Sequence, residues 1–248
     1  MIVSEQHRYS IRVLLICLFG WTIANMDQSF FGYAIPAIMA EFDVDLVFIG
    51  LILTVAFLIS VITVVASGLL ADKYGRKTLF AICLSASAAL VGLHSIAPNI
   101  ESLAMLRCAA FAISTGLVPI TNALIVETAP ARYRGIYSGI LQCGYPLGWF
   151  LASLIALPLM TDFGWRSIFL PAFLVIPLAI VLARKLPESK KFEDNKGADK
   201  SSDIGFSDRL KIIFSPPYRL RALLGLLAFI CYGGAYAGTA FYFPTFFQ

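Results

Sequence analysis

Two ionisable side chains lie inside long apolar stretches of the sequence, Asp27 within residues 13–35 and Arg107 within residues 103–126. A charged group inside a membrane helix costs about 2.5 to 3.5 kcal/mol on insertion scales, and such residues commonly serve a function. An arginine there offers a two-pronged site for a carboxylate or another anion, and an aspartate can take up a proton. Asp27 and Arg107 are therefore the first candidates for chemistry.

The depths of these two side chains in a membrane match. Asp27 lies about eight residues before the end of its stretch, and Arg107 about five residues after the start of its own, at a helical rise of 1.5 Å per residue. If the two helices run in opposite directions, both side chains lie in the same half of the bilayer. We expect them to meet at a substrate site, and the alternative is a purely structural pair.

The predicted helix over residues 103–126 carries a polar face. Residues spaced by three, four and seven positions share one side of a helix, and this spacing joins Arg107, Phe111, Ser114, Val118 and Thr121. A polar face along a membrane helix is typical of a cavity wall. In the alternative interpretation, Arg107 extends toward the headgroups, and the hydroxyls of Ser114 and Thr121 bond their own backbone.

The predicted helix over residues 136–160 has a different character. Small residues recur there at every fourth position, namely Gly144, Gly148, Ala152 and Ala156. This pattern predicts a face for close helix packing. Polar and aromatic residues elsewhere in the spans are further candidates to line the cavity: Gln142, Tyr145, Tyr232, Tyr236 and Tyr242. We include Gln142, Tyr145 and Tyr236 with Arg107 and Ser114 in the predicted substrate site.

The composition of the chain indicates that membrane-spanning helices position these candidate residues. Of the 248 residues, 59% are apolar and 14% are charged, whereas soluble domains contain about 25% charged residues. This balance excludes a water-soluble enzyme and indicates an integral membrane protein. Seven apolar runs are long enough to cross a bilayer as helices, at residues 13–35, 46–70, 78–97, 103–126, 136–160, 166–185 and 221–247. The prediction is an all-α membrane protein with seven transmembrane helices.

The basic residues predict the orientation. Of the 19 Lys and Arg residues, all except Arg107 and Arg166 lie before the first run, after the even-numbered runs, or at the ends of those runs. Because Lys and Arg stay on the cytoplasmic side, the N-terminus is expected to be cytoplasmic, in the plasma (inner) membrane. The net charge of +4 therefore reflects topology, and no nucleic-acid partner is implied.

Residues for enzymatic or metal chemistry are sparse. The two histidines, His7 and His94, lack ligand spacing. All five cysteines fall inside the runs as expected core residues: Cys17, Cys83, Cys108, Cys143 and Cys231. We expect no enzyme, no metal and no cofactor. A seven-helix receptor or retinal protein is disfavoured by the cytoplasmic N-terminus and by the lack of a lysine in the last run.

One segment of the chain is polar enough to lie in water. Residues 187–220 combine Lys, Glu and Asp with Ser, Gly and Asn, which is typical of a flexible linker. The predicted organisation is a six-helix transmembrane bundle over residues 1–186, a cytoplasmic linker over residues 187–220, and one further helix over residues 221–248.

The loop after the second apolar run carries a distinctive sequence motif. It reads Gly68-Leu-Leu-Ala-Asp72-Lys-Tyr-Gly75-Arg76-Lys77, and it resembles the signature loop between helices 2 and 3 of the major facilitator superfamily. Three further segments agree with this resemblance: Glu127-Thr-Ala-Pro-Ala-Arg-Tyr-Arg134-Gly135, Gly164-Trp-Arg166 and Leu186-Pro-Glu-Ser189. Together they are similar to the proton-coupled symporters of sugars and organic acids.

The loop residues also have a physical interpretation of their own. Gly68 and Gly75 permit a tight reversal and close helix approach, Asp72 lies near the start of the third helix, and Arg76 and Lys77 are expected in water or among headgroups. The resemblance implies that the loop aspartate holds an inner gate shut against the other half of the transporter. Glu127 is expected to pair with Arg76, Arg132 or Arg134 in a companion charge cluster.

The resemblance implies a partial major facilitator fold. The first six helices would form two inverted three-helix repeats, and the seventh would begin a second half whose remaining helices are missing from this sequence. The first and fourth helices begin the two repeats, which would place Asp27 and Arg107 against the central cavity. Because alternating access needs both halves, we expect that the 248-residue chain alone does not transport.

The sequence predicts a secondary transporter that couples a small polar organic anion, such as a carboxylate, to protons. Arg107 would bind the carboxylate. Asp27, ionised while Arg107 is near, would take up a proton when the substrate draws Arg107 away. Three alternatives remain: a sugar or polyol proton symporter, a drug antiporter, and a truncated fragment without transport activity.

Overall fold

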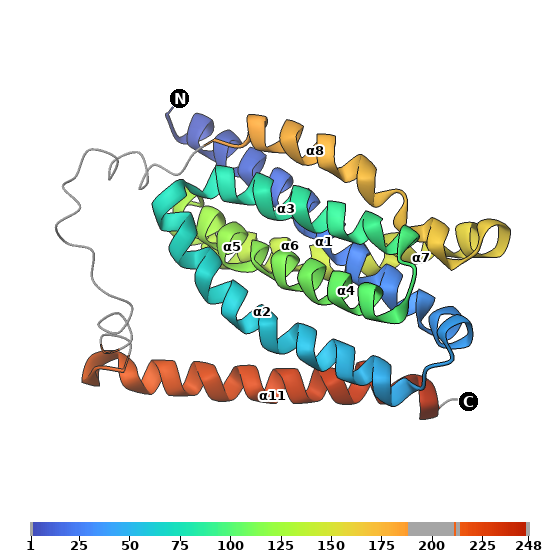
Figure 1. Ribbon diagram of the computed structural model, residues 1–248. Helices are drawn as coiled ribbons and strands as arrows, with labels where there is room; N and C mark the ends of the chain where they lie inside the picture. The colour runs from blue at the N-terminus through green and yellow to red at the C-terminus, as the bar shows by residue number, and fades with distance from the viewer. Residues whose placement is uncertain (1, 188–210, 212–213, 247–248) are drawn as a thin grey trace. The chain divides into compact units, whose positions relative to one another are not determined.

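The computed structural model describes the backbone of residues 2–187, 211 and 214–246, and the side chains of residues 7–187, 211 and 214–231. Within these ranges every regular element is helical (Figure 1), as predicted. The chain forms two compact units, residues 1–197 and 198–248, and each is described by itself. The division falls inside the predicted linker over residues 187–220, most of which lies outside the described residues.

The first unit contains six segments that are long and apolar enough to cross a membrane, counted within the described residues. They are His7–Phe42, Leu46–Tyr74, Arg76–Ile96, Ile100–Thr128, Ala131–Phe163 and Trp165–Lys185. These segments confirm the first six predicted spans. Each includes residues beyond the apolar run, and helix α1, Ile2–Phe42, begins eleven residues before its run.

The first three segments are nearly continuous helices. They comprise α1, α2 (Leu46–Tyr74) and α3 (Arg76–Leu93), which continues in the short 3-10 helix η1 (His94–Ile96). Gly75 separates α2 from α3 with a φ of 91°, a conformation that favours glycine. The side chain of Asp45 accepts a hydrogen bond from the backbone N–H of Phe48 and caps the start of α2.

Prolines divide the later segments. Pro119 and Pro146 cannot donate a hydrogen bond to the carbonyl four residues earlier. The helices break beside those carbonyls, giving α4 (Ile100–Thr115), α5 (Leu117–Thr128), α6 (Arg134–Gln142) and α7 (Gly144–Phe163). A short turn η2 (Ala131–Tyr133) precedes α6. In the last segment, Pro171 separates η3 (Trp165–Phe169) from α8 (Ala172–Lys185).

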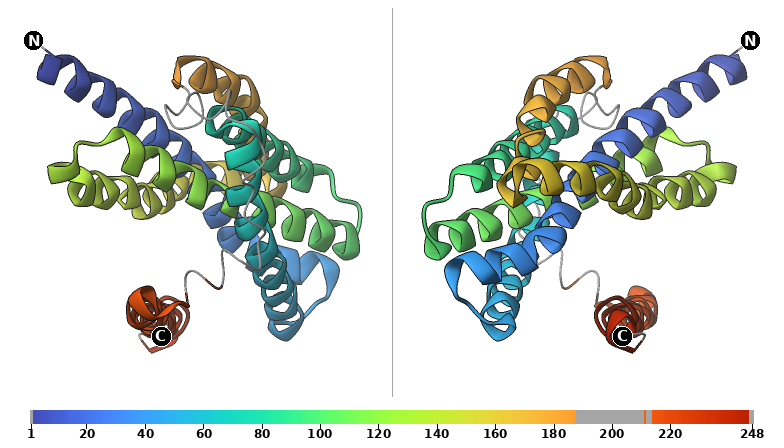
Figure 2. Two further views of the ribbon diagram at one scale, coloured as in Figure 1. Left: turned by 90° about the vertical axis from the view of Figure 1, so that its left-hand side faces the viewer. Right: turned by 90° about the vertical axis from the view of Figure 1, so that its right-hand side faces the viewer.

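Within the first unit α1 packs against α7, α2 against α4, and α3 against α8 (Figures 1 and 2). The predicted close-packing stripe is confirmed, because Gly144, Gly148, Ala152 and Ala156 are all buried on α7. A Cβ atom added at Gly148 would lie 2.5 Å from the carbonyl oxygen of Thr22 on α1. Glycine therefore allows the two helices to approach closely at this point.

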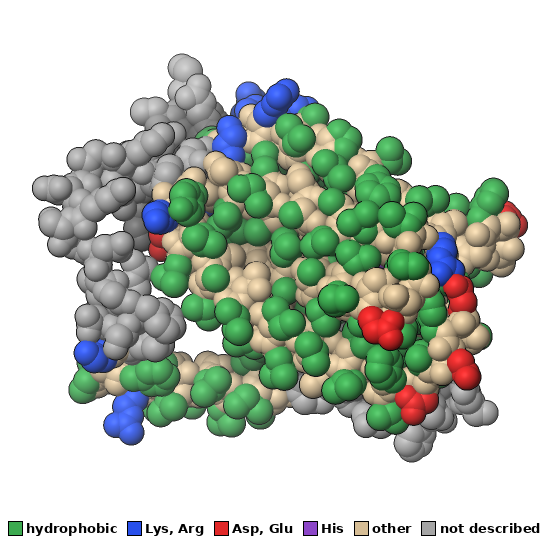
Figure 3. Space-filling model, in the orientation of Figure 1, with side chains coloured by type: hydrophobic (Ala, Val, Ile, Leu, Met, Phe, Trp, Pro, Cys, Tyr) green, Lys and Arg blue, Asp and Glu red, His purple; other side chains and the backbone are tan. Residues whose placement is uncertain are grey.

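Hydrophobic side chains cover the middle of the face shown in Figure 3. Helix α2 is apolar on its outer surface as well as its inner one, with Leu58, Val61 and Ile62 exposed. Inside the unit, the buried apolar residues form two clusters, one around Phe80 and Leu124 and one around Phe30 and Leu103. An apolar surface of this extent matches a lipid environment.

Within its described residues, the second unit contains the long helix α11, Pro216–Phe246. It spans 31 residues, which exceeds the roughly 20 residues needed to cross a hydrocarbon core. It begins five residues before the start of the predicted run at residue 221. The side chains of Tyr232, Tyr236 and Tyr242 lie outside the described residues, so their proposed place in a substrate site stays a prediction.

Candidate functional site

Arg107 lies on α4 and is buried in the first unit, with 5% of its surface exposed. The carbon of its guanidinium lies 4.4 Å from the ring centre of Phe31 on α1 and 5.5 Å from that of Phe111 on α4. Both contacts are of the cation–π type, which is stronger when water is excluded. The guanidinium is therefore enclosed by aromatic rings.

Asp27, on α1, is buried beside this group, with 3% of its surface exposed. Its charge and that of Arg107 interact, but no ion pair within 4.0 Å joins them among the described residues. One carboxylate oxygen of Asp27 and the Nε atom of Arg107 have no hydrogen-bond partner in the structure. A direct salt bridge, the structural alternative for this pair, is not formed in this conformation.

His94 belongs to the same buried region, although its sequence position did not single it out. Its ring lies 5.1 Å from that of Phe169 and 6.2 Å from that of Phe31, and Arg107 is close enough to act on it electrostatically. Its Nδ1 atom faces the carbonyl oxygens of Leu90 and Val91 at 2.8 and 3.1 Å. Because carbonyls only accept, Nδ1 carries the proton, and Nε2 is left as a buried acceptor without a partner.

Asp27 and Arg107 are both buried, and their expected place against the central cavity stays a prediction. Aromatic side chains lie beside Arg107. The ring of Phe111 meets that of Phe57 on α2, with ring centres 4.7 Å apart. Phe57 is 54% exposed, whereas Phe111 is 6% exposed. A ligand that reached Arg107 from this side would displace or pack against these two rings.

On the polar face predicted for the fourth span, the hydroxyls bond their own backbone, as in the alternative interpretation. Ser114 donates to the carbonyl of Phe111 at 3.0 Å, and Thr121 donates to that of Leu117 at 2.7 Å. Both hydroxyls remain able to accept. Gln142 is exposed at the end of α6. Tyr145 packs against the apolar cluster around Phe80 and Leu124, and its ring centre lies 5.9 Å from that of Trp149.

The loop between α2 and α3 forms a charge cluster. Arg76 pairs with Glu127 at the end of α5, and it lies 3.4 Å from Asp72. Arg76 is 8% exposed, which differs from the expectation that it lies in water or among headgroups. Its two carboxylate partners explain why burial is tolerated. Of the three partners considered for Glu127, the structure gives Arg76.

The other residues of this loop differ in their roles. Lys77 is half-buried. In the companion segment after α5, the Nε atom of Arg134, the first residue of α6, donates to the carbonyl of Ala129 at 3.3 Å. Gly75 makes the turn, but a Cβ atom at Gly68 would meet nothing within 4 Å. The predicted close helix approach at Gly68 is therefore not seen among the described residues.

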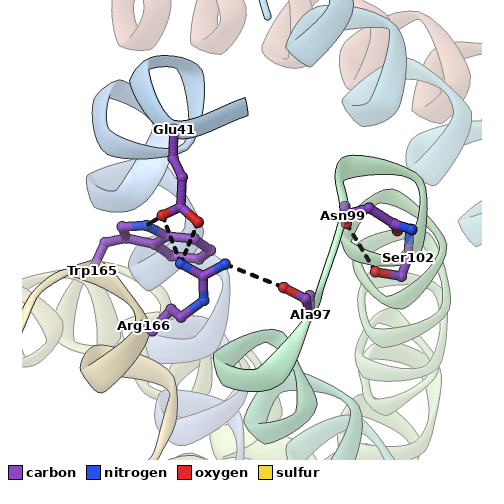
Figure 4. A network of polar contacts seen from close by, with 6 residues as sticks. All are labelled: Glu41, Ala97, Asn99, Ser102, Trp165 and Arg166. Carbon is purple, nitrogen blue, oxygen red and sulfur yellow. Dashed lines mark hydrogen bonds and ion pairs between the residues drawn. The ribbon is translucent and has the colours of Figure 1, made fainter. Parts of the chain in front are cut away.

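A second polar network joins three segments at the opposite end of the unit (Figure 4). Arg166 binds Glu41, at the end of α1, at 2.6 Å, and it also donates to the carbonyl of Ala97 at 3.2 Å. The indole of Trp165 donates to the same carboxylate at 2.7 Å. Asn99 caps α4 through the backbone of Ser102 beside this network. Each charged group here has a partner.

A buried cation and a buried carboxylate inside a membrane-length helical unit are typical of a secondary transporter. A sequence model of the Major Facilitator Superfamily matches residues 17–248. The chain belongs to this superfamily, and the resemblance found in its motifs is confirmed.

Several curated transporters are similar in sequence. The chain is 31% identical to the 4-hydroxybenzoate transporter PcaK of Pseudomonas aeruginosa over 206 residues, which cover 79% of this chain and 44% of the relative. It is 28% identical to the niacin transporter NiaP of Acinetobacter baylyi, over 77% of this chain and 43% of the relative. It is 26% identical to the sialic acid transporter NanX of Escherichia coli, over 90% and 54%. The chain therefore spans about half the length of these relatives.

Solved structures confirm the fold. A bacterial homologue of the human lysosomal transporter Spinster, in an inward-facing and unoccupied conformation, aligns with a TM-score of 0.67 and 19% identity, covering 84% of this chain and 50% of that one. The inward-open xylose transporter XylE from E. coli aligns with a TM-score of 0.65 and 15% identity, covering 86% and 55%. The fold is a partial major facilitator fold in an integral membrane protein.

Proposed function

We propose that the complete transporter carries a small aromatic carboxylate together with a proton. The observation that supports this most is the guanidinium of Arg107, which is buried against the rings of Phe31 and Phe111 and keeps an unpaired Nε–H. A carboxylate satisfies a guanidinium with two parallel hydrogen bonds. The aromatic ring of such a substrate would pack where Phe57 now meets Phe111.

The relatives agree with this chemistry. 4-Hydroxybenzoate, niacin and sialic acid, named for three of them, all carry a carboxylate, and the first two carry it on an aromatic ring. The carboxylate is thus the shared feature, and Arg107 is its proposed partner. The enclosing phenylalanines favour the aromatic acids over the sugar acid.

The lack of a direct ion pair between Asp27 and Arg107 supports the proposed coupling to protons. The two charges interact without a direct ion pair, so a substrate carboxylate can occupy Arg107 without first breaking one. Once Arg107 is neutralised by the substrate, Asp27 is a buried carboxylate without a compensating cation, and protonation relieves its desolvation. Substrate and proton would then move together, with Asp27 as the coupling residue.

A panel of matched ligands tests the substrate class. Binding to the purified chain is measured for nicotinate against nicotinamide, and for benzoate against cyclohexanecarboxylate. We expect nicotinamide to bind about 10-fold or more weakly, because hydrogen bonds to charged groups contribute about 1.5 to 3 kcal/mol. Equal binding of nicotinate and nicotinamide contradicts the carboxylate site, and preference for the cyclohexane ring contradicts the aromatic part.

Asp27→Asn tests the coupling in cells that express the complete transporter. The variant should lose proton-driven accumulation but keep part of the exchange of internal for external substrate. Asp43→Asn, at an exposed residue between α1 and α2, is the matched control and should accumulate normally. Accumulation against a gradient at the normal rate by Asp27→Asn would make Asp27 a structural residue.

The topology has its own test. We propose that the end of the unit with Arg76 and Arg132 faces the cytoplasm, as the count of basic residues indicates. In intact cells, a membrane-impermeant thiol reagent should label Asp43→Cys and leave Arg132→Cys unmodified. The reverse labelling would invert the assigned orientation.

A further inference from the structure

A pocket lies between the first and last helices of the first unit. It has a volume of about 790 Å³, and residues near the start of α1 and at the end of α8 line it. Four basic residues and three aliphatic residues line it: Arg8, Arg12, Arg184, Lys185, Ile11, Leu15 and Ile16. No acidic residue is among the described lining residues. The transport mechanism proposed above uses none of them.

Among the described residues, the four pocket cations differ from Arg76 and Arg166 of the same unit in having no carboxylate partner within 4.0 Å. Arg76 has two carboxylate partners and Arg166 has one, but the described residues include no ion pair or hydrogen bond to the four pocket cations. Arg8 and Arg12 stand one turn apart on α1, an arrangement in which like charges repel. An anion bound between them would relieve this repulsion.

The apolar part of the pocket indicates what kind of anion fits. Leu15 is 57% exposed and Ile11 is 38% exposed, whereas Ile16 is 8% exposed. From Arg8 to Leu15 the helix rises about 10 Å at 1.5 Å per residue, so the aliphatic surface extends from the cations toward the middle of the bundle. A free phosphate would leave this surface uncovered. A lipid presents a charged headgroup and an acyl chain in the same order.

We propose that this pocket is a binding site for an anionic phospholipid. The phosphodiester of the headgroup would lie between the arginines of α1 and the basic pair at the end of α8, and one acyl chain would lie along Ile11 and Leu15. Figure 3 shows Lys and Arg side chains grouped where α1 starts and α8 ends. Basic pockets between membrane helices on the cytoplasmic side bind such headgroups, and the positive-inside count assigns this end to the cytoplasm. The bound lipid would join the first and last helices of the bundle.

Native mass spectrometry of the 248-residue chain in a neutral detergent tests the proposal. The chain is titrated with phosphatidylglycerol and, separately, with phosphatidylcholine. We expect one phosphatidylglycerol to bind tightly. The double variant Arg12→Gln/Arg184→Gln should weaken that binding about 30-fold, from about 5-fold for each basic residue near a membrane surface. A second pair, Arg8→Gln/Lys185→Gln, should weaken it similarly and guards against a folding defect in the first.

Arg219→Gln/Arg221→Gln is the matched control, because it removes the same charge from exposed positions on α11 and should leave binding unchanged. Excess inorganic phosphate should fail to displace the lipid, since it cannot occupy the apolar wall. The proposal is overturned if phosphatidylcholine binds equally well, if the control pair loses as much affinity as the pocket pairs, or if inorganic phosphate displaces the lipid. It is also overturned if both folded pocket variants bind lipid like the parent chain, or if the parent chain binds none.

Discussion

Arg107 and Arg166 differ in both their burial and their polar partners. Arg166 is partly exposed and binds Glu41 at 2.6 Å and the carbonyl of Ala97 at 3.2 Å. Arg107 is buried, is flanked by Phe31 and Phe111, and has no ion pair within 4.0 Å among the described residues. The arginine with more access to water is the one with more protein partners.

We propose that this difference separates a structural role, that of Arg166, from a functional one, that of Arg107. A buried charge without a partner is costly, and a protein that keeps one gains from it in another state, such as the substrate-bound state. The Glu41 network joins three segments at one end of the unit, and its two charged groups are paired with each other. Arg107 and Asp27 retain unsatisfied atoms, which a carboxylate and a proton would satisfy.

The largest loss of ligand binding is expected when Arg107, which has no ion pair among the described residues, is replaced. Arg107→Ala should weaken binding of benzoate about 100-fold or more, because two hydrogen bonds to a charged group contribute about 3 kcal/mol or more together. Arg107→Lys should recover only part of this, since lysine cannot form the bidentate pair. Isothermal titration of the purified chain measures both.

Arg166→Ala is the matched control for that measurement, and it should bind benzoate within a few-fold of the parent. If Arg107→Ala bound benzoate normally while Arg166→Ala did not, the assignment of the two regions would be reversed.

A smaller effect should come from the contact that positions Asp27. A Cβ atom at Gly148 would lie 2.5 Å from the carbonyl oxygen of Thr22 and 3.1 Å from the backbone nitrogen of Met26, the residue before Asp27. Gly148→Ala should therefore push α1 and α7 apart, lower the stability by about 1 to 3 kcal/mol, and weaken ligand binding by moving Asp27. Loss of helical circular dichroism with increasing denaturant measures the stability.

Gly139→Ala, where an added Cβ meets nothing within 4 Å, is the matched control and should be neutral or slightly stabilising. Equal stability of the two variants would show that α1 and α7 can separate at no cost, and that Asp27 is not held by this contact.

The sequence predicts well what depends on neighbours along the chain. The apolar runs predicted the six spans of the first unit, and the fourfold spacing from Gly144 to Ala156 predicted the buried face of α7. The loop from Gly68 to Lys77 predicted the superfamily. The spans and the buried face follow from local composition and periodicity, whereas the superfamily follows from the resemblance of one short motif to a known signature.

Contacts between distant segments were not predictable in the same way. The burial of Arg76 depends on Glu127 from another helix, and a loop position alone indicates exposure. His94 enters the site only because Phe31 and Phe169 pack around its ring. The enclosure of Arg107 depends on Phe31 from α1, which no periodicity within α4 reveals.

The smallest change in stability is expected from breaking the ion pair between Arg166 and Glu41. The side chains of Arg166 and Glu41 are 35% and 40% exposed, and exposed pairs contribute about 0.2 to 1 kcal/mol in double-mutant cycles. A cycle of Glu41→Gln, Arg166→Gln and the double variant, measured by denaturation of the purified chain, should give a coupling free energy in this range. Glu41→Gln keeps an acceptor for the indole of Trp165, so that hydrogen bond contributes little to the difference.

The same cycle measured on benzoate binding should give a coupling near zero, because the network lies at the end of the unit and binds no ligand in this scheme. A coupling in binding comparable to the effect of Arg107→Ala would mean that the Glu41 network changes with the transport state. The paired arginine would then belong to the mechanism, and the contrast between the two regions would no longer separate structure from function.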